Sequence, residues 1–368
     1  MAILAFGLFS CPTAAATLPE PISAVEGLKP GADCPDAGTA GTEALAAAAQ
    51  AAIPLKVGLT LSSVWKVNER DYEHECLRQI AAIDVRGMLV KQSCPIGPAH
   101  ELKHYQRRVC WADFVNSSVY LPEASPDFPE TFVGSLNFSL SIASFVDLKA
   151  HGTTTQRYIQ PDEHQQQFLD TDIHASFKSD GASTFKLIVN DKVVDIPTIE
   201  AASIKGNEIV RIKVLDDARF PLLLDYYVPT LNKFFITFTK ISYPTPNEVE
   251  HSLAVEKHAD IYGIYFDFAS ATLRAESEPV LHEIADALRT HMDWKLLING
   301  HTDNIGTDAQ NLELSRQRAI TVRAALMSRF QIDGARLSTN GLGASQPKES
   351  NETVSGRARN RRVELVRL

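Results

Sequence analysis

The chain has 368 residues, of which 44% are hydrophobic and 22% charged; this composition excludes a largely disordered protein and predicts two or three domains. The net charge of −9 is unevenly placed, because residues 261–368 carry 14 basic and 13 acidic side chains and residues 1–260 carry 22 and 32. An acidic body disfavours nucleic acid as a partner, since phosphate contacts need clustered lysines and arginines.

The first segment has the pattern of an export signal. An apolar run over residues 1–9 is followed by small residues that end at Ala16 and offer an A-x-A cleavage site. The run is too short to span a bilayer, which needs roughly 20 residues. We expect a signal peptide over residues 1–16. The alternative is lipidation of Cys11, which the preceding residues favour only weakly because they are a poor lipobox.

Residues 17–53 are rich in Ala, Pro, Gly and Thr, and we expect them to form a linker with a short alanine-rich helix over residues 43–50. Both processing routes leave four cysteines, and an even number in an exported chain predicts disulfides. Three pairings are open, and no C-x-x-C spacing supports a zinc ribbon or a redox site. The alternative is four reduced cysteines in a cytosolic protein. The disulfide candidates are Cys34, Cys76, Cys94 and Cys110.

The stretch from residue 54 to residue 245 is expected to be a β-rich, sandwich-like domain, because apolar and polar residues alternate along it. Asn190-Asp191 stands between two apolar runs and predicts a hairpin. Alternating strands are also typical of outer-membrane barrels, but uneven strand lengths, frequent charges and the cysteines argue against that alternative. The alternation is clearest over residues 55–67, 136–142 and 234–241.

No catalytic spacing is visible in this region: the sequence contains no H-E-x-x-H, no G-x-S-x-G and no glycine-rich phosphate loop. His100 and His104 are four residues apart, as two ligands on one helix face would be, but no third metal ligand is evident nearby. We therefore expect neither an enzyme nor a metal or cofactor site.

Residues 246–260 are expected to be a polar helix or linker, and a second domain is expected over residues 261–368. There the pattern predicts strand, helix, strand, helix and two further strands, a compact α/β sandwich that makes the whole chain an α+β protein. The expected strands are residues 261–266, 295–298, 337–341 and 361–366, and the expected helices are 276–291 and 311–330.

Two charged residues stand at the junction between the second of these strands and the helix that follows it. Asp303 lies in a polar, glycine-bounded loop, and Arg318 lies about two turns into the helix expected to begin at Asn311. A ligand that carries both an ammonium and a carboxylate would bridge such a pair.

Four sequence blocks cover roughly 30% of the chain and resemble the OmpA C-terminal-like family. The resemblance implies a domain that binds the diaminopimelate of peptidoglycan without covalent chemistry. In that family the aspartate binds the ammonium of the ligand and the arginine its carboxylate, and these roles fall on Asp303 and Arg318. Thr302 and Asn311 match positions that line the pocket. The blocks are YFDF with ATL (265–268, 271–273), NGHTDNIG (299–306), NLELS with RA (311–315, 318–319) and GLG with NRRVE (341–343, 360–364).

The arginine fork suits a carboxylate, and backbone N–H groups at the start of the expected helix would add anion contacts. Asn360-Arg361-Arg362 is expected to have a structural role and to pair with acids across the sheet.

The sequence thus predicts an exported envelope protein of the periplasm, associated with the outer membrane, that tethers its β-rich part to peptidoglycan. Other envelope proteins are expected partners through residues 54–245, for example in a secretion or motor assembly. Membrane association stays open because no strong anchor is visible. Two alternatives are retained: a wall-acting enzyme that the C-terminal module only targets, and an outer-membrane barrel with a periplasmic module.

Overall fold

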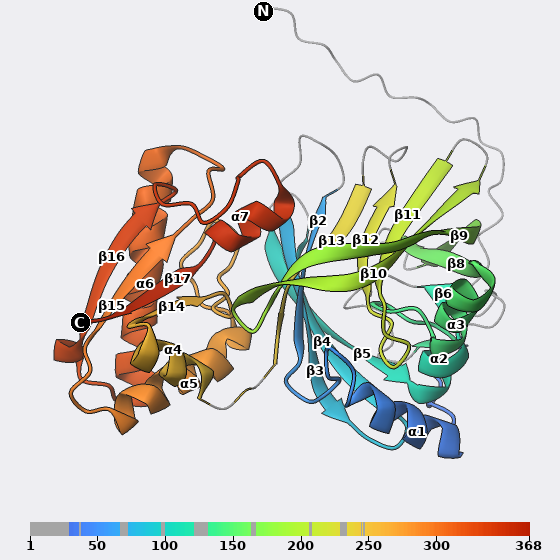
Figure 1. The fold of residues 1–368 in the computed structure, drawn as a ribbon, viewed down its shortest axis with the longest axis horizontal. Helices are drawn as coiled ribbons and strands as arrows, with labels where there is room; N and C mark the ends of the chain where they lie inside the picture. Colours follow the sequence, from blue (N-terminus) through green and yellow to red (C-terminus); the bar gives the residue numbers. More distant parts are fainter. Residues whose placement is uncertain are drawn as a thin grey trace, which may run out of the picture.

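The computed structural model describes residues 29–368 apart from 37, 67–72, 97–99, 121–131, 163–166, 206–207, 229–233, 244 and 246. The expected signal peptide, Cys11 and the first part of the expected linker therefore lie outside the described residues. The described chain forms two units that lie side by side, each with its own sheet and its own hydrophobic packing (Figure 1).

The first unit is β-rich, as predicted. Its main sheet has 11 strands in the described part of the chain, in the order β5-β4-β3-β2-β13-β12-β11-β10-β9-β8-β6. The sheet curls, because the end of β9 also pairs in parallel with β13. The strands are β2 (Thr60–Lys66), β3 (His74–Ile83), β4 (Gly87–Ile96), β5 (Glu101–Cys110), β6 (Val119–Tyr120), β8 (Thr153–Asp162), β9 (Gln167–Val189), β10 (Lys192–Lys205), β11 (Glu208–Leu215), β12 (Leu223–Val228) and β13 (Phe234–Ser242), with β1 (Lys29–Pro30) and β7 (Phe132–Val133) forming a separate pair.

Three helices pack at the edge of this sheet: α1 (Gly38–Ala48), α2 (Trp111–Asn116) and α3 (Ile142–His151). Residues of α1 correct the sequence interpretation, because Ala44 and Ala48 are buried in the same core as Leu61 and Phe238. The segment 38–53, expected to be a linker, is therefore part of the folded unit. Its alanines form the expected helix, and their small side chains let that helix pack closely against α2 at the edge of the core.

The expected strand over residues 136–142 is the clearest error within this unit. Leu136, Phe138 and Leu140 are buried, but within the described part of the chain the segment makes isolated bridges, at Leu136 and from Ser139 to Leu222, in place of a continuous strand, and Ile142 begins α3. Its backbone amides reach distant carbonyls instead of a regular neighbouring strand. An alternating pattern records which side chains are buried, and here a buried irregular segment produces the same pattern.

The hairpin at Asn190-Asp191 is confirmed: the two residues connect β9 to β10 with φ of 44° and 63°, the left-handed backbone that asparagine and aspartate tolerate best. The disulfide prediction is also confirmed, and the structure selects one pairing. Cys34 bonds to Cys110, and Cys76 on β3 bonds to Cys94 on β4.

The second unit has a four-stranded sheet in the order β14-β17-β15-β16, and the predicted α+β class is confirmed. Helices α5 and α6 pack on this sheet through Leu281, Ile284, Val322 and Leu326. In chain order the elements are α4 (Glu248–Val255), β14 (His258–Ile261), a short 3-10 turn (Ala275–Ser277), α5 (Glu278–Thr290), β15 (Leu296–His301), α6 (Asp308–Phe330), a second 3-10 turn (Gly334–Arg336), β16 (Leu337–Gly343), α7 (Val354–Asn360) and β17 (Val363–Arg367).

Three elements of this unit differ from the sequence prediction. The first strand covers residues 258–261 and ends where the expected strand was to begin, so only a bridge from Phe266 to Leu273 remains of the rest. Helix α4, in the expected linker 246–260, buries Val249 and Leu253 in the core of the second unit. Helix α7 was not predicted, because its seven residues carry no apolar periodicity. Among the described residues, no helix is both long and apolar enough to cross a membrane.

The two units share a polar interface. The buried Arg274 of the second unit donates to the backbone oxygens of Glu75 (3.1 Å) and Ser93 (2.8 Å) in the first. At another point the backbone N–H of Tyr262 donates to Asp191 at the tip of the β9–β10 hairpin, at 2.5 Å. Helix α7 lies between the second sheet and the strands of the first unit (Figure 1).

Candidate functional site

The loop that follows β15 is positioned by two glycines that let α6 approach the sheet closely. A Cβ atom at Gly300 would lie 2.1 Å from the backbone oxygen of Ser315, and one at Gly341 would lie 2.6 Å from the backbone nitrogen of Arg316. Neither position tolerates a side chain, because the obstructing atoms belong to the helix backbone. Thr307 then starts α6 with a capping box that Gln310 completes. The loop between them is therefore fixed at both ends.

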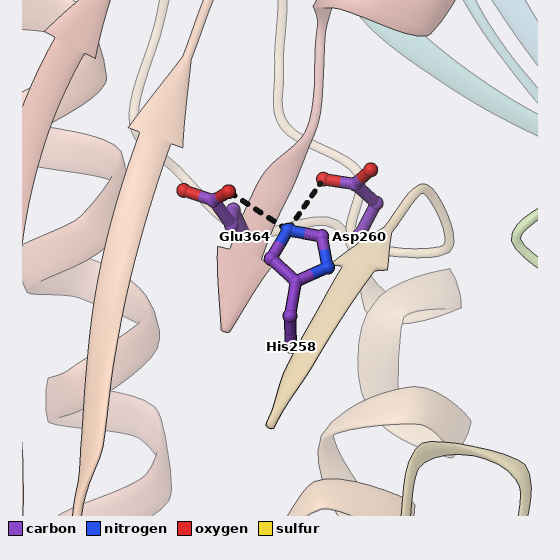
Figure 2. A group of neighbouring side chains, drawn as sticks. All are labelled: His258, Asp260 and Glu364. Carbon is purple, nitrogen blue, oxygen red and sulfur yellow. Dashed lines mark hydrogen bonds and ion pairs between the residues drawn. The ribbon is translucent and has the colours of Figure 1, made fainter. Parts of the chain in front are cut away.

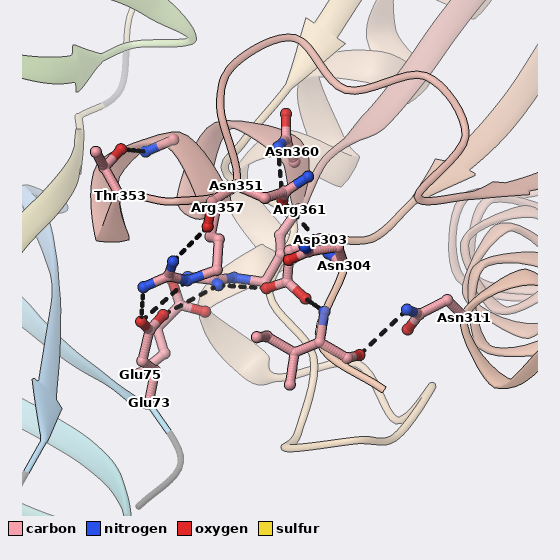
Figure 3. Close-up of polar contacts among 12 residues, drawn as sticks. Glu73, Glu75, Asp303, Asn304, Asn311, Asn351, Thr353, Arg357, Asn360 and Arg361 are labelled. Atoms are coloured by element: carbon pink, nitrogen blue, oxygen red, sulfur yellow. Dashed lines mark hydrogen bonds and ion pairs between the residues drawn. The ribbon is translucent and has the colours of Figure 1, made fainter. Parts of the chain in front are cut away.

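Asp303 lies in this loop and is 8% exposed. Its Oδ1 accepts a hydrogen bond from the backbone N–H of Ile305 at 3.0 Å, and its Oδ2 accepts one from Arg361 Nη1 at 2.7 Å (Figure 3). The carboxylate that the sequence singled out is thus held in a fixed direction. Its direct cationic partner, however, is Arg361 from the loop before β17 and not Arg318.

Arg318 projects from α6 into the region between the two units. Its Nε donates to the backbone oxygen of Ser270 at 2.9 Å, and its guanidinium carbon lies 4.8 Å from the centre of the Phe266 ring. Burial lowers the pKa of Arg318 to about 10, with Arg361 acting in the same direction and Glu75 and Asp303 opposing it. Its two terminal nitrogens make no hydrogen bond within the described part of the chain, so both can donate to a ligand.

Thr302 and Asn311 are buried beside Asp303. Thr302 Oγ1 has no hydrogen-bond partner among the described residues, whereas Asn311 Nδ2 donates to the backbone oxygen of Ile305 at 3.1 Å. Asn311 therefore braces the loop. The helix begins at Asp308, three residues earlier than expected, so the Asn311 N–H is already bonded to Thr307 and offers no anion contact.

The sequence interpretation missed two arginines and two glutamates at this site. Arg357 on α7 donates from Nε to Glu73 Oε1 at 3.0 Å, and Arg361 Nη1 lies 3.6 Å from Glu73 Oε2 (Figure 3). The neighbouring Glu75 bonds to Lys240 Nζ at 2.7 Å. Both glutamates belong to the first unit, so the site lies at the interface between the units. The polar run that contains them gave no signal of this, because only the fold brings it to the arginines.

Charges within this interface are strongly coupled. Burial alone would raise the pKa of Glu75, but Lys240 and Arg361 hold it well below its usual range. Burial would likewise lower the pKa of Arg361, yet Asp303, Glu75 and Glu73 raise it above its usual value. Glu75 and Arg361 are therefore ionised at neutral pH, and each depends on its oppositely charged partners for stabilisation.

The expected structural role of Asn360 and Arg362 agrees with their contacts. Asn360 accepts from the backbone N–H groups of Lys348 and Glu349 at 2.8 and 3.1 Å, and Arg362 Nε donates to Asp260 Oδ1 at 2.9 Å. Arg361 departs from that expectation, because its partner Asp303 belongs to the candidate site.

A second polar cluster, His258, Asp260 and Glu364, lies across β14 and β17 (Figure 2). His258 Nε2 is 2.8 Å from Glu364 Oε1 and 3.6 Å from Asp260 Oδ1. The three donors have the chemistry of metal ligands, but Arg362 and Lys348 already bind Asp260, at 2.9 and 3.1 Å. These cations occupy the positions where a metal ion would add positive charge, so the cluster is best explained as an ion-pair network.

Comparison with known proteins agrees with this reading of the second unit. Residues 265–361 match the family described as OmpA family. Outer membrane protein A of Bordetella avium is 44% identical over 101 residues, 27% of this chain and 52% of that protein. The peptidoglycan-binding protein ArfA of Mycobacterium bovis is 42% identical over 103 residues, 28% of this chain and 31% of that protein.

A crystal structure of the peptidoglycan-associated lipoprotein from Burkholderia pseudomallei is 34% identical, with a TM-score of 0.27, and covers 28% of this chain and 88% of that one. The chain spans about half, or less, of the length of the two curated relatives named above. The resemblance seen in the four sequence blocks is confirmed: residues 265–361 are an OmpA family domain.

Proposed function

We propose that this chain is a cell-envelope protein that binds peptidoglycan non-covalently through its OmpA family domain. The observation that carries the proposal is that a fixed carboxylate, Asp303, lies close enough to Arg318 for their charges to interact, and that the terminal nitrogens of Arg318 have no partner among the described residues. The named relatives are outer membrane and peptidoglycan-binding proteins, which supports the same function and an envelope location.

The proposed ligand is the zwitterionic end of diaminopimelate. Its ammonium would bind Asp303, and its carboxylate would take the two free terminal nitrogens of Arg318 in a forked contact. Thr302 Oγ1, buried and without a partner in the described part of the chain, would supply one further hydrogen bond. The bound state forms by ion pairing and hydrogen bonding, and no covalent step is involved.

Sedimentation with purified sacculi tests this proposal. Wild-type protein should sediment with the sacculi, whereas Asp303→Asn and Arg318→Ala should stay in the supernatant. Two variants serve as matched controls: Asp308→Asn removes a carboxylate at the start of the same helix, and Arg316→Ala removes an exposed arginine two positions from Arg318. Equal sedimentation of Asp303→Asn, Arg318→Ala and wild type would show that the site is assigned incorrectly.

The β-rich unit would be the part that the OmpA family domain tethers to the wall, and other envelope proteins are its proposed partners. Incubation of sacculi with the protein, followed by analysis of the soluble wall fragments, separates tethering from wall cleavage. We expect no new fragments, and their appearance would favour the retained alternative of a wall-acting enzyme.

A further inference from the structure

The β-rich unit presents a carboxylate to the same arginines that border the candidate site. Glu73 directly precedes β3, and its Oε1 accepts two hydrogen bonds from Arg357, from Nε and Nη2. Its Oε2 lies 3.6 Å from Arg361 Nη1, the atom that also binds Asp303 at 2.7 Å. Arg361 therefore links Glu73 to Asp303, the carboxylate that the ammonium of the proposed ligand would bind.

The buried carboxylate of Glu73 lacks one of the hydrogen bonds that it could accept. Its side chain is 13% exposed, and Oε2 is buried without a hydrogen-bond partner in the described part of the chain. A buried carboxylate oxygen that lacks a hydrogen bond costs free energy, even with a cation nearby. The contact therefore holds Glu73 in place without giving it the best partners. Arg361, which Glu73 approaches, also acts electrostatically on Arg318, so a carboxylate bound to Arg318 would compete with Glu73 for Arg361.

Glu75, two residues further along the chain, adds a second negative charge near the same arginines. It is held by Lys240 and by Ser62 Oγ, each at 2.7 Å, and its charge acts on both Arg318 and Arg361. While the two units are docked, an incoming carboxylate meets two fixed negative charges beside the arginines. Like charges in a site of low dielectric constant repel strongly.

An aromatic stack holds the two units together on this side. The ring of Phe268, in the loop whose Ser270 binds Arg318, lies 4.2 Å from the ring of His100. His74, between Glu73 and Glu75, stacks on Trp65 with ring centres 4.4 Å apart and lies 5.0 Å from His100. The loop that anchors Arg318 and the strand that carries the glutamates therefore move apart only if this stack opens.

We propose that Glu73 is an internal stand-in for the carboxylate of the wall peptide, so that docking of the β-rich unit and binding of the ligand exclude each other at this site. This inference rests on the proposed function. Wall binding would then select the fraction of molecules in which the units have separated, and the apparent dissociation constant is raised by the reciprocal of that fraction.

The test uses the full chain, with meso-diaminopimelate as the soluble probe in titration calorimetry and purified sacculi in sedimentation. Glu73→Gln keeps the shape of the side chain and removes its charge, so the dissociation constant should fall about fivefold or more. Glu101→Gln, an exposed change on β5, is the matched control and should leave binding at the wild-type value. Circular dichroism melts would establish that the variants are folded.

Hydrogen exchange of the wild-type chain gives a second measurement that needs no variant. Saturating meso-diaminopimelate should accelerate exchange at the start of β3 and in α7, because these segments lose their contact when the units separate.

The possible results distinguish the role proposed for Glu73 from the proposed binding of peptidoglycan. Wild-type or weaker binding by Glu73→Gln, or unchanged or slower exchange in β3 and α7, overturns the stand-in even if Asp303→Asn abolishes binding. Full binding by Asp303→Asn instead overturns the proposed function itself.

Discussion

The charge on Asp191 should destabilise the docked protein at neutral pH, and its removal by Asp191→Asn is our most detailed prediction. Asp191 stands at the tip of the β9–β10 hairpin, where burial raises the pKa of its carboxyl from 3.8 to about 7; Glu283 and Glu248 reinforce the rise, and the backbone hydrogen bonds of Tyr262 and Gly263 oppose it. A carboxyl whose pKa is higher in the folded state binds its proton more tightly there than in the unfolded chain.

The raised pKa of Asp191 makes the free energy of unfolding depend on pH. Between pH of about 4 and 7 the folded protein holds a proton on Asp191 that the unfolded chain has released, so this group makes the free energy of unfolding decrease as pH rises. The full shift corresponds to a ceiling of about 4 kcal/mol at 1.36 kcal/mol per unit. Because the hairpin tip is only half-buried, solvent screens part of this charge, and we expect about 1–2 kcal/mol, or several degrees in melting temperature.

Asparagine retains an oxygen that can accept the Tyr262 N–H and lacks the charge. Asp191→Asn should therefore be more stable than wild type at pH 8, and the difference should nearly vanish as the pH falls to about 4, as measured by thermal melts at both values. Asp195→Asn removes an exposed carboxylate from the same hairpin and is the control. A difference between Asp191→Asn and wild type that is the same at both pH values would refute the electrostatic reasoning.

Three further predictions concern the framework of the site and the β-rich unit. Gly300→Ala should cost about 2–3 kcal/mol, because its Cβ would overlap the Ser315 backbone oxygen, whereas Gly263→Ala, with only ordinary contacts, should cost far less in urea melts. Reduction of the two disulfides, which close loops of 18 and 76 residues, should lower the urea midpoint of the β-rich unit, since such loops are worth about 3 and 4.5 kcal/mol. Arg318→Lys keeps the charge and loses the fork, so calorimetry should show at least about tenfold weaker binding of meso-diaminopimelate, and wild-type affinity would contradict the forked contact.

Local patterns in the sequence were sufficient for the OmpA family domain. Its helices and strands follow apolar periodicity, and the element order was predicted with boundary errors of a few residues, apart from the first strand and α7. The hairpin at Asn190-Asp191 could also be predicted, because two residues in the left-handed region leave a clear chemical signature.

The misassigned segments have a common physical cause, which is packing between residues far apart in the sequence. The alanine-rich segment 38–53 read as a linker because its own composition shows no apolar face, yet Cys34 and α1 attach it to the core. Residues 136–142 alternate like a strand, but their backbone hydrogen bonds go to Val119, Pro221 and Leu223, which no single neighbouring strand supplies. The role of Glu73 was invisible for the same reason, since its arginine partners lie 284 and 288 positions further along the chain.

Asp191 and Glu73 lie at two points of the same interface, and their charges have opposite effects on docking. This difference gives an independent test of the proposal that Glu73 stands in for the ligand carboxylate. Docking buries Asp191 against the second unit close to Glu283 and Glu248, so its charge opposes docking even though backbone N–H groups of that unit donate to it, and its removal should favour docking. Glu73 bonds to the arginines beside the site, so its charge supports docking.

If docking and wall binding exclude each other, the two substitutions must act in opposite directions. Asp191→Asn should weaken the binding of meso-diaminopimelate at pH 8, where docked wild type carries the charge. The difference between the two proteins should shrink towards zero as the pH falls to about 4, because Asp191 in the separated units stays ionised down to its ordinary pKa. Glu73→Gln should strengthen binding at pH 8. The Asp191 side chain accepts a hydrogen bond from the backbone N–H of Tyr262, directly after β14, and no hydrogen bond or ion pair joins it to Asp303 or Arg318 among the described residues. An effect of this substitution on binding would therefore indicate a shift in docking. Unchanged affinity in a stabilised Asp191→Asn protein at pH 8 would therefore separate docking from wall binding and leave Glu73 with a purely structural role.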